Sequence, residues 1–109
     1  IHDDGKFAGW TDDGYDSSLS KSPRDIQLLT ATYYGKLDIE NGGFHQFFGN
    51  TTGVFAPEMV EWFERSGMVE SARIVREAIN VFGTRFPRSQ HERKSFLDKY
   101  KVATREEWD

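Results

Sequence analysis

The sequence predicts an all-α protein, a compact bundle of about five helices preceded by an irregular N-terminal arm. Apolar residues recur at spacings of three and four along most of the chain, as they do on one face of a helix. No stretch shows the alternation of apolar and polar residues that is typical of a strand. Proline- and serine-containing helix starts, together with glycines that end helices, divide the chain into segments of helical length.

The composition is that of one small domain with an aromatic core. The chain has 109 residues, which fits a single domain, and 15% of them are aromatic. It contains no cysteine, so disulfides and thiol catalysis are excluded. No apolar run approaches the roughly 20 residues that span a bilayer. We therefore expect a soluble, cytoplasmic protein that does not contact a membrane.

The first 21 residues differ from the rest of the chain. They are rich in Asp, Gly and Ser, and their large apolar side chains follow no period. We interpret residues 1–21 as an irregular arm, which is either pinned to the domain by its aromatic residues or disordered. Residues 22–109 then form the single helical domain.

The first helix is expected over residues 23–38. Ser22 is a candidate N-cap, and Pro23 suits the first helical position. Apolar residues then recur at spacings of three, four and four, which places them on one face of a helix. These residues are Ile26, Leu29, Tyr33 and Leu37.

A motif of glycines, phenylalanines and side-chain amides follows over residues 41–53. Asn41 is a candidate cap for a short helix over about 43–50, and Gly53 is expected to end the motif in a left-handed conformation. Three rings at i, i+3 and i+4 share one face, which we place at the centre of the core. The motif positions are Asn41, Gly42, Gly43, Phe44, Gln46, Phe47, Phe48, Asn50 and Gly53. Asn41, Gln46 and Asn50 are expected to satisfy backbone groups of the turn. The alternative is that Gln46 and Asn50, together with His45, line a groove for a partner.

Three more helices complete the prediction. The third begins at Ala56-Pro57 and is stopped by Gly67, and the fourth spans about 69–82. The fifth spans about 90–101 and starts with capping-box spacing at Ser89. The same spacing at residues 104–107 indicates a last single turn or a longer helix that has been cut.

Residue patterns typical of catalysis are missing. The three histidines, His2, His45 and His91, have no second His or Cys at metal-ligand spacing. The chain has neither a Gly-x-Ser-x-Gly elbow nor a phosphate-binding Gly-rich loop ending in Lys. We therefore expect a non-enzymatic protein with no catalytic residue, no cofactor and no metal.

Charge is distributed unevenly along the chain. The formal net charge is −4, with −7 over residues 1–64 and +3 over residues 65–109. Five acidic residues bracket the motif: Asp38, Glu40, Glu58, Glu61 and Glu64. They form a candidate face for a basic protein partner. The alternative is that they belong to an ordinary solvated helix face. The C-terminal bases are interleaved with acids, which favours a solvated face over nucleic-acid binding: Arg85, Arg88, Arg93, Lys94, Lys99, Lys101 and Arg105.

Over residues 23–100 the chain resembles a family of small helical bacterial domains that is named after a DNA-mimic protein. The resemblance rests on Asn41-Gly42-Gly43-Phe44 and Gln46-Phe47-Phe48, with Asn50, Gly53 and the two helices that follow. It implies a helical bundle without catalytic activity. In the founding member an acidic surface imitates DNA and occupies a DNA-binding protein. The basic second half of this chain departs from that pattern, which leaves two other functions open: an immunity-type toxin inhibitor and a nucleic-acid-binding module.

Overall fold

The structure is a computed structural model that describes residues 21–100. Within that range it contains helices and no strand, which confirms the all-α prediction. The elements are α2 (Arg24–Gly49), the 3-10 helix η2 (Thr51–Phe55), α3 (Ala56–Arg65), α4 (Val69–Asn80) and α5 (Gln90–Tyr100). The predictions for the arm over 1–20 and for the turn at 104–107 lie outside the described residues.

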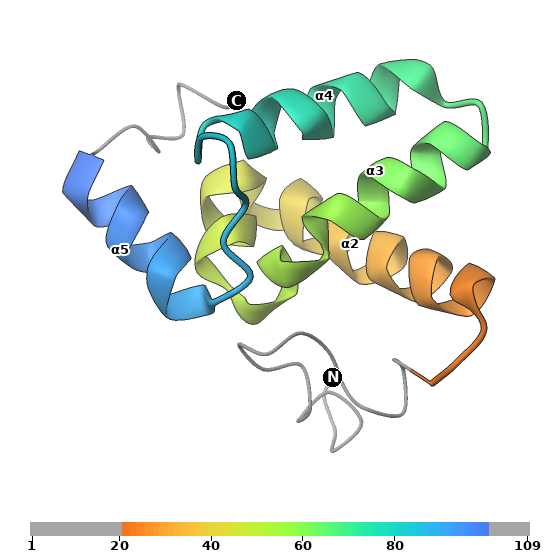
Figure 1. Ribbon diagram of the computed structural model, residues 1–109, viewed down its shortest axis with the longest axis horizontal. Coiled ribbons are helices and arrows are strands. Elements are labelled where there is room, and N and C mark those ends of the chain that lie inside the picture. The colour runs from red at the N-terminus through yellow and green to blue at the C-terminus, as the bar shows by residue number, and fades with distance from the viewer. Residues whose placement is uncertain (1–20, 101–109) are drawn as a thin grey trace.

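The helices are arranged around α2, the longest of them. Helices α3 and α4 are connected by a short turn, run in opposite directions and pack against each other (Figure 1). Helix α3 and η2 also pack on α2. Helix α5 lies at the end of the molecule where α2 finishes, and it contacts both α2 and η2 (Figure 1). The C-terminal half of α2, which holds the motif, is thus surrounded by the other elements.

The two N-terminal helices expected from the sequence form one kinked helix. Helix α2 runs through residues 38–43, where a break was predicted, so the count of about five helices was too high. Asn41 is therefore not a helix cap. The kink lies at Gly43, whose φ of 80° and ψ of −179° are accessible almost only to glycine. The two helical segments meet at this one residue, with no loop between them.

The buried face of α2 is not the apolar face from which the helix was predicted. The buried residues include Leu28, Ala31, Thr32 and Gly35. A Cβ on Gly35 would lie 2.4 Å from Met59 Sδ, so the glycine allows α3 to approach closely. In contrast, Ile26, Leu29, Tyr33 and Leu37 are 47%, 49%, 57% and 48% exposed. Small residues let α3 and η2 come close, and the large residues point the other way.

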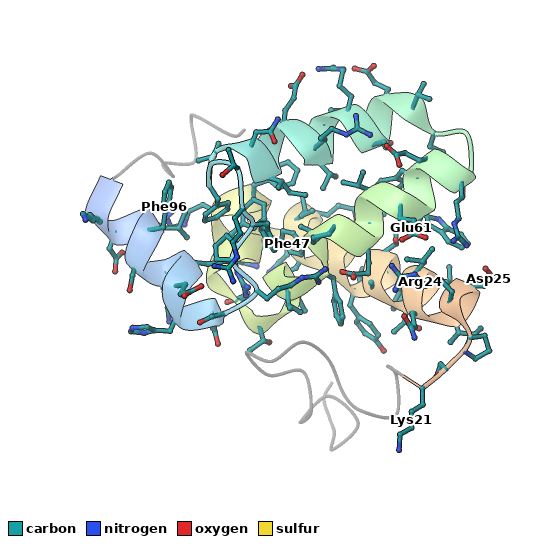
Figure 2. The ribbon with its side chains drawn as sticks, viewed as in Figure 1. Lys21, Arg24, Asp25, Phe47, Glu61 and Phe96 are labelled. Carbon is teal, nitrogen blue, oxygen red and sulfur yellow. The ribbon has the colours of Figure 1, made fainter. Side chains whose placement is uncertain are left out.

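The three motif rings lie in the core, as predicted. Phe47 and Phe48 are fully buried, Phe44 is 7% exposed, and Phe47 occupies the centre of the bundle (Figure 2). The core continues from Phe48 to Phe82, with ring centroids 5.0 Å apart, and from Phe82 to Phe96, again at 5.0 Å. Because Phe96 belongs to α5, this row of rings joins α5 to the motif.

The remaining helices agree with the sequence to within a few residues. Helix α3 has a proline at its first turn, and it is followed by Gly67 at a φ of 76°. Helix α4 ends two residues earlier than predicted, ahead of Gly83 at a φ of 98°. At the start of α5, the Glu92 amide donates to Ser89 Oγ over 3.1 Å, as the predicted cap requires.

Candidate functional site

The polar motif residues converge on the carboxylate of Asp38. Gln46 Nε2 donates to Asp38 Oδ1 over 2.8 Å, and Thr52 Oγ1 donates to Oδ2 over 2.6 Å. Asn50 Nδ2 donates to Oδ2 over 3.1 Å. Asp38 precedes the kink at Gly43, whereas all three donors follow it, so one carboxylate connects the first part of α2 with the end of α2 and with η2. Asp38 therefore has a structural role in addition to its predicted place on an acidic face.

Two motif glycines are required by close contacts. A Cβ on Gly42 would lie 2.1 Å from Gln46 Oε1, so the glycine leaves room for the side chain that reaches Asp38. A Cβ on Gly53 would lie 2.6 Å from the Phe47 carbonyl oxygen. Gly53 does not have a positive φ, so the predicted left-handed conformation was wrong. Its role is to let η2 pack against the backbone at the end of α2.

Arg93 is a buried arginine that holds the end of α2. Its side chain is fully buried, with Nε donating to the Phe48 carbonyl and Nη2 to the Asn50 carbonyl, both over 2.8 Å. Nη1 donates to the Arg88 and Pro87 carbonyls over 2.7 and 3.2 Å. The last carbonyl groups of a helix lack hydrogen-bond donors within the helix, and at the end of α2 the Arg93 guanidinium is such a donor. Its assignment to a solvated basic face was therefore wrong. The signal that was available is its position on the same face of the helix as Phe96 and Leu97.

A hollow of about 850 Å³ lies beside the Asp38 cluster. Side chains from α2, η2 and α5 line it, and most of them are polar: Tyr34, Leu37, Asp38, Asn41, Asn50, Thr51, Thr52 and Gln90. Of the three residues expected to line a groove, only Asn50 does so. Gln46 is directed to Asp38, and His45 is exposed elsewhere.

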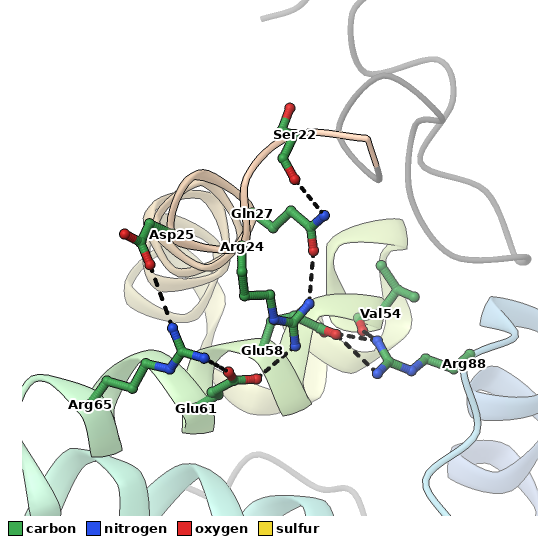
Figure 3. Close-up of polar contacts among 9 residues, drawn as sticks. All are labelled: Ser22, Arg24, Asp25, Gln27, Val54, Glu58, Glu61, Arg65 and Arg88. Carbon is green, nitrogen blue, oxygen red and sulfur yellow. Dashed lines mark hydrogen bonds and ion pairs between the residues drawn. The ribbon is translucent and has the colours of Figure 1, made fainter.

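Glu58 is not on the protein surface, in contrast to its predicted place on the acidic face. It is 3% exposed and forms a two-pronged ion pair with Arg88, from Nη1 to Oε1 over 2.8 Å and from Nη2 to Oε2 over 3.1 Å. Arg88 Nη1 also donates to the Val54 carbonyl over 2.7 Å. This pair connects α3 to the segment that precedes α5 (Figure 3). Glu58 cannot meet a partner without breaking this pair, whereas the Arg88 side chain is 41% exposed.

Glu61 lies in an ion-pair network at the start of α2. Arg24 donates to it over 2.6 Å, and Arg65, four residues further along α3, donates over 2.7 Å. Arg65 also approaches Asp25 at 3.5 Å (Figure 3). The hydrogen bond from Arg24 is the main cause that lowers the pKa of Glu61, and Arg65 adds to it. Glu61 is therefore charged at neutral pH but compensated by two arginines.

The other two acids of the predicted face are also paired with bases. Glu40 contacts Lys36 over 2.7 Å, and Glu64 pairs with Arg76 of α4. A similar pair on α4, between Glu70 and Arg73, lowers the pKa of Glu70 through the hydrogen bond it accepts. The predicted acidic row is thus a row of ion pairs. Asp38 is the exception among the five, since its three hydrogen bonds come from neutral side chains.

The side of α2 that faces away from the bundle is apolar. We call Ile26, Leu29, Tyr33 and Leu37 the outer face of α2; each is about half exposed. Leu37 also lines the polar hollow described above. A smaller apolar hollow of about 200 Å³ lies on another side of α2, between α2, α3 and α4, and includes Lys36 and Glu40 at its edge. The outer face therefore lies between two concave regions.

Residues 21–100 contain no cluster of three or more His, Cys, Asp or Glu side chains arranged to hold a metal ion. No helix in this range is both long enough and apolar enough to cross a membrane. Two members of the predicted basic set, Arg88 and Arg93, make internal contacts. Lys101 and Arg105 lie outside the described range. Nucleic-acid binding by this set would therefore depend on fewer bases than the sequence suggests.

A family model described as DMP19-like protein matches residues 20–109. No curated protein and no solved structure matches the chain.

Proposed function

Since the chain belongs to the DMP19-like family, we propose that it is a non-enzymatic, protein-binding domain of the DNA-mimic type that engages a basic, DNA-binding protein. The observation that supports this most directly is where the negative charge lies. Residues 21–100 contain ten acidic and eleven basic residues, a balance of +1. Residues 1–20 contain five acidic residues and one basic residue, a balance of −4. The charge that would attract a basic partner therefore lies just ahead of α2.

A DNA mimic needs negative charge that its own bases do not neutralise. Duplex DNA carries one negative charge per about 1.7 Å of its axis, and proteins that bind it present matching bases. The glutamates of α2 and α3 are each close to a Lys or Arg of the same chain. We therefore infer that aspartates of residues 1–20 make the main electrostatic contact with the partner: Asp3, Asp4, Asp12, Asp13 and Asp16.

The surface acids of α2 and α3 make a secondary contact with the basic partner. Glu40 and Glu64 have side chains 58% and 52% exposed, and Glu61 is 33% exposed. An exposed ion pair contributes only about 0–1 kcal/mol, so a partner's base can replace the internal one at little cost. The buried Glu58 is excluded from this contact.

Competition with DNA tests the proposal. Basic proteins from the organism that encodes this chain are prepared by elution from heparin. They are passed over the immobilised chain with and without excess duplex DNA. DNA mimicry predicts capture of a DNA-binding protein, and loss of that capture when DNA is added. Capture that persists in the presence of DNA, or no capture at low salt, would contradict the proposal.

Two variants identify the contact. Replacing the five aspartates of residues 1–20 by Asn should abolish most of the capture, because it removes the segment's excess of negative charge. The variant Glu40→Gln, Glu61→Gln, Glu64→Gln removes three compensated charges and should weaken capture less. If the second variant has the larger effect, the contact lies on α2 and α3 instead.

A further inference from the structure

The carboxylate of Asp38 is held in place by uncharged groups only. Gln46 and Thr52 donate to one oxygen each, over 2.8 and 2.6 Å, whereas Asn50 is shared between the two oxygens at 3.1 and 3.3 Å. A carboxylate can accept about four hydrogen bonds, so a further donor can still reach it. Because the side chain is already oriented, it loses little conformational freedom when a ligand binds. Asp38 is thus a preorganised acceptor whose charge no neighbouring base offsets.

This carboxylate lines the polar hollow between α2, η2 and α5. The hollow has a volume of about 850 Å³, within the range of roughly 300–1,000 Å³ that is common for ligand pockets. Asp38 is its one charged residue, since no Lys, Arg or His stands among the described side chains that line it. In contrast, Glu40, Glu61 and Glu64 each lie within ion-pair distance of a base. The hollow therefore has the charge that complements a cation.

Other polar side chains of the hollow offer further acceptor oxygens. Asn41 and Thr51 are exposed, and within residues 21–100 neither side chain forms a hydrogen bond. Amide and hydroxyl oxygens accept hydrogen bonds from N–H groups. A guanidinium carries five N–H groups in a planar fork, whereas an ammonium carries three on one point charge. An arginine can thus use more of these acceptors at once than a lysine can.

The walls of the hollow also suit a long side chain with a charged head. Tyr34 and Leu37 of α2 supply its apolar part. Tyr34 is half-buried and packs against Ala31, Val54 and Phe55, so its ring is held in place. An arginine lays its methylene groups along such surfaces while its guanidinium stays with polar groups, and a tyrosine ring also attracts the cation.

We propose that the polar hollow receives one arginine side chain of the basic partner, with its guanidinium on the carboxylate of Asp38 and its methylene groups along Tyr34 and Leu37. DNA-binding proteins use arginine to contact phosphates, so Asp38 takes the place of a phosphate for this residue. The inference rests on the proposed function for the identity of the partner. It adds one specific contact to the general attraction that the aspartates of residues 1–20 exert.

A small arginine ligand tests the hollow without the partner. N-acetyl-arginine methylamide is titrated into the isotope-labelled full chain at constant ionic strength, and backbone amide chemical shifts are followed. We expect saturable changes centred on Asn41, Asn50, Thr51 and Thr52, with a dissociation constant in the millimolar range, as a ligand of this size allows.

Two related ligands are the controls. The citrulline analogue has nearly the same shape without the charge and should bind at least about tenfold more weakly. Equal binding of the arginine and citrulline ligands would overturn the proposal, as would the absence of any saturable change at about 100 mM arginine ligand. Tighter binding of the lysine analogue would contradict the choice of arginine.

A matched pair of substitutions locates the bound ligand. Asn41→Arg gives the hollow a base of its own, which can pair with Asp38, and should abolish the saturable shifts. Asn80→Arg adds the same charge at an exposed position at the end of α4, which does not line the hollow, and should leave binding unchanged. We prefer these variants to Asp38→Asn, because that change also alters the hydrogen bonds with Gln46 and Thr52. Unchanged binding by Asn41→Arg, or an equal loss in both variants, would contradict the proposal.

The same two variants separate this inference from the proposed function. In the capture experiment Asn41→Arg should retain at least about tenfold less of the basic protein than Asn80→Arg, although both have the same net charge. If the arginine ligand binds in the hollow but no basic protein is captured in competition with DNA, the proposed function fails and the arginine site stands. If a basic protein is captured equally by the two variants, the proposed function stands and the partner does not use the hollow.

Discussion

At the scale of single residues, the polar members of the motif act inside the molecule. Asp38 accepts hydrogen bonds from Gln46, Asn50 and Thr52, and Gly42 leaves room for Gln46. The sequence indicated that these residues belong together, because they are close in the chain and are of types that satisfy turns. It could not indicate that one carboxylate joins them, since Asp38 precedes the motif and its distance to each donor depends on the kink.

Arg93 shows the limit of residue-level reasoning most clearly. Arginine is rarely buried, so its place in a set of bases favoured a solvated face. Its burial follows from the C-terminal carbonyls of α2, which become neighbours of α5 only in the folded chain. No sequence pattern marks a contact between residues that lie more than forty positions apart.

Replacing Arg93 should strongly destabilise the fold. Arg93→Met keeps much of the volume but removes the side-chain donor of four carbonyl oxygens, of which that of Asn50 retains the Gly53 amide. We expect a loss of about 3 kcal/mol or more in the free energy of unfolding, measured by urea denaturation. Lys94→Met, at the next, exposed position, should change it by no more than about 0.5 kcal/mol. Similar losses for the two variants would show that the buried contacts contribute little.

At the scale of elements, the kink in α2 determines the geometry of the motif. The sequence predicted a helix end near residue 38 because glycines and Asn41 weaken the helix there. In the structure the helix continues, and Gly43 alone takes a non-helical conformation. The kink immediately precedes Phe44, Phe47 and Phe48, which all lie in the core, so it sets the direction in which the segment that carries these rings runs.

Two glycines of the same helix should respond oppositely to alanine. Gly43→Ala forces a Cβ into a conformation that alanine avoids, at a cost of about 2 kcal/mol or more in the free energy of unfolding. Gly49→Ala adds a Cβ in open space and should be neutral or stabilise by about 0.5 kcal/mol. Thermal and urea unfolding of both variants measure the difference. An unchanged Gly43→Ala variant would mean that the kink is not required.

At the scale of the whole molecule, one core connects the four α-helices of residues 21–100. Buried residues from α2, α3 and α4 and from α5 belong to the same cluster, and the ring row from Phe48 to Phe96 extends it to the end of the bundle. The charges behave differently: within residues 21–100 they are nearly balanced and mostly paired. Residues 21–100 thus carry little net charge, and the net negative charge of the sequence lies mainly in residues 1–20.

A shared core predicts cooperative unfolding. In a Trp10→Phe, Trp108→Phe variant, the remaining Trp62 reports on α3, while far-ultraviolet circular dichroism reports on all helices. We expect the two urea transitions to have the same midpoint. Loss of helix signal at a lower urea concentration than the Trp62 signal would mean that one helix, such as α5, unfolds on its own.

The sequence by itself determined the helical class, the approximate bounds of α3, α4 and α5, and the central position of the motif rings, because these depend on local periodicity, capping and side-chain size. Only the tertiary structure decided which side of α2 is buried, how Arg93 and Glu58 are used, and that the surface glutamates are paired. These features depend on close approach between distant segments, where a missing Cβ or an unpaired carbonyl outweighs the hydrophobicity of a helix face.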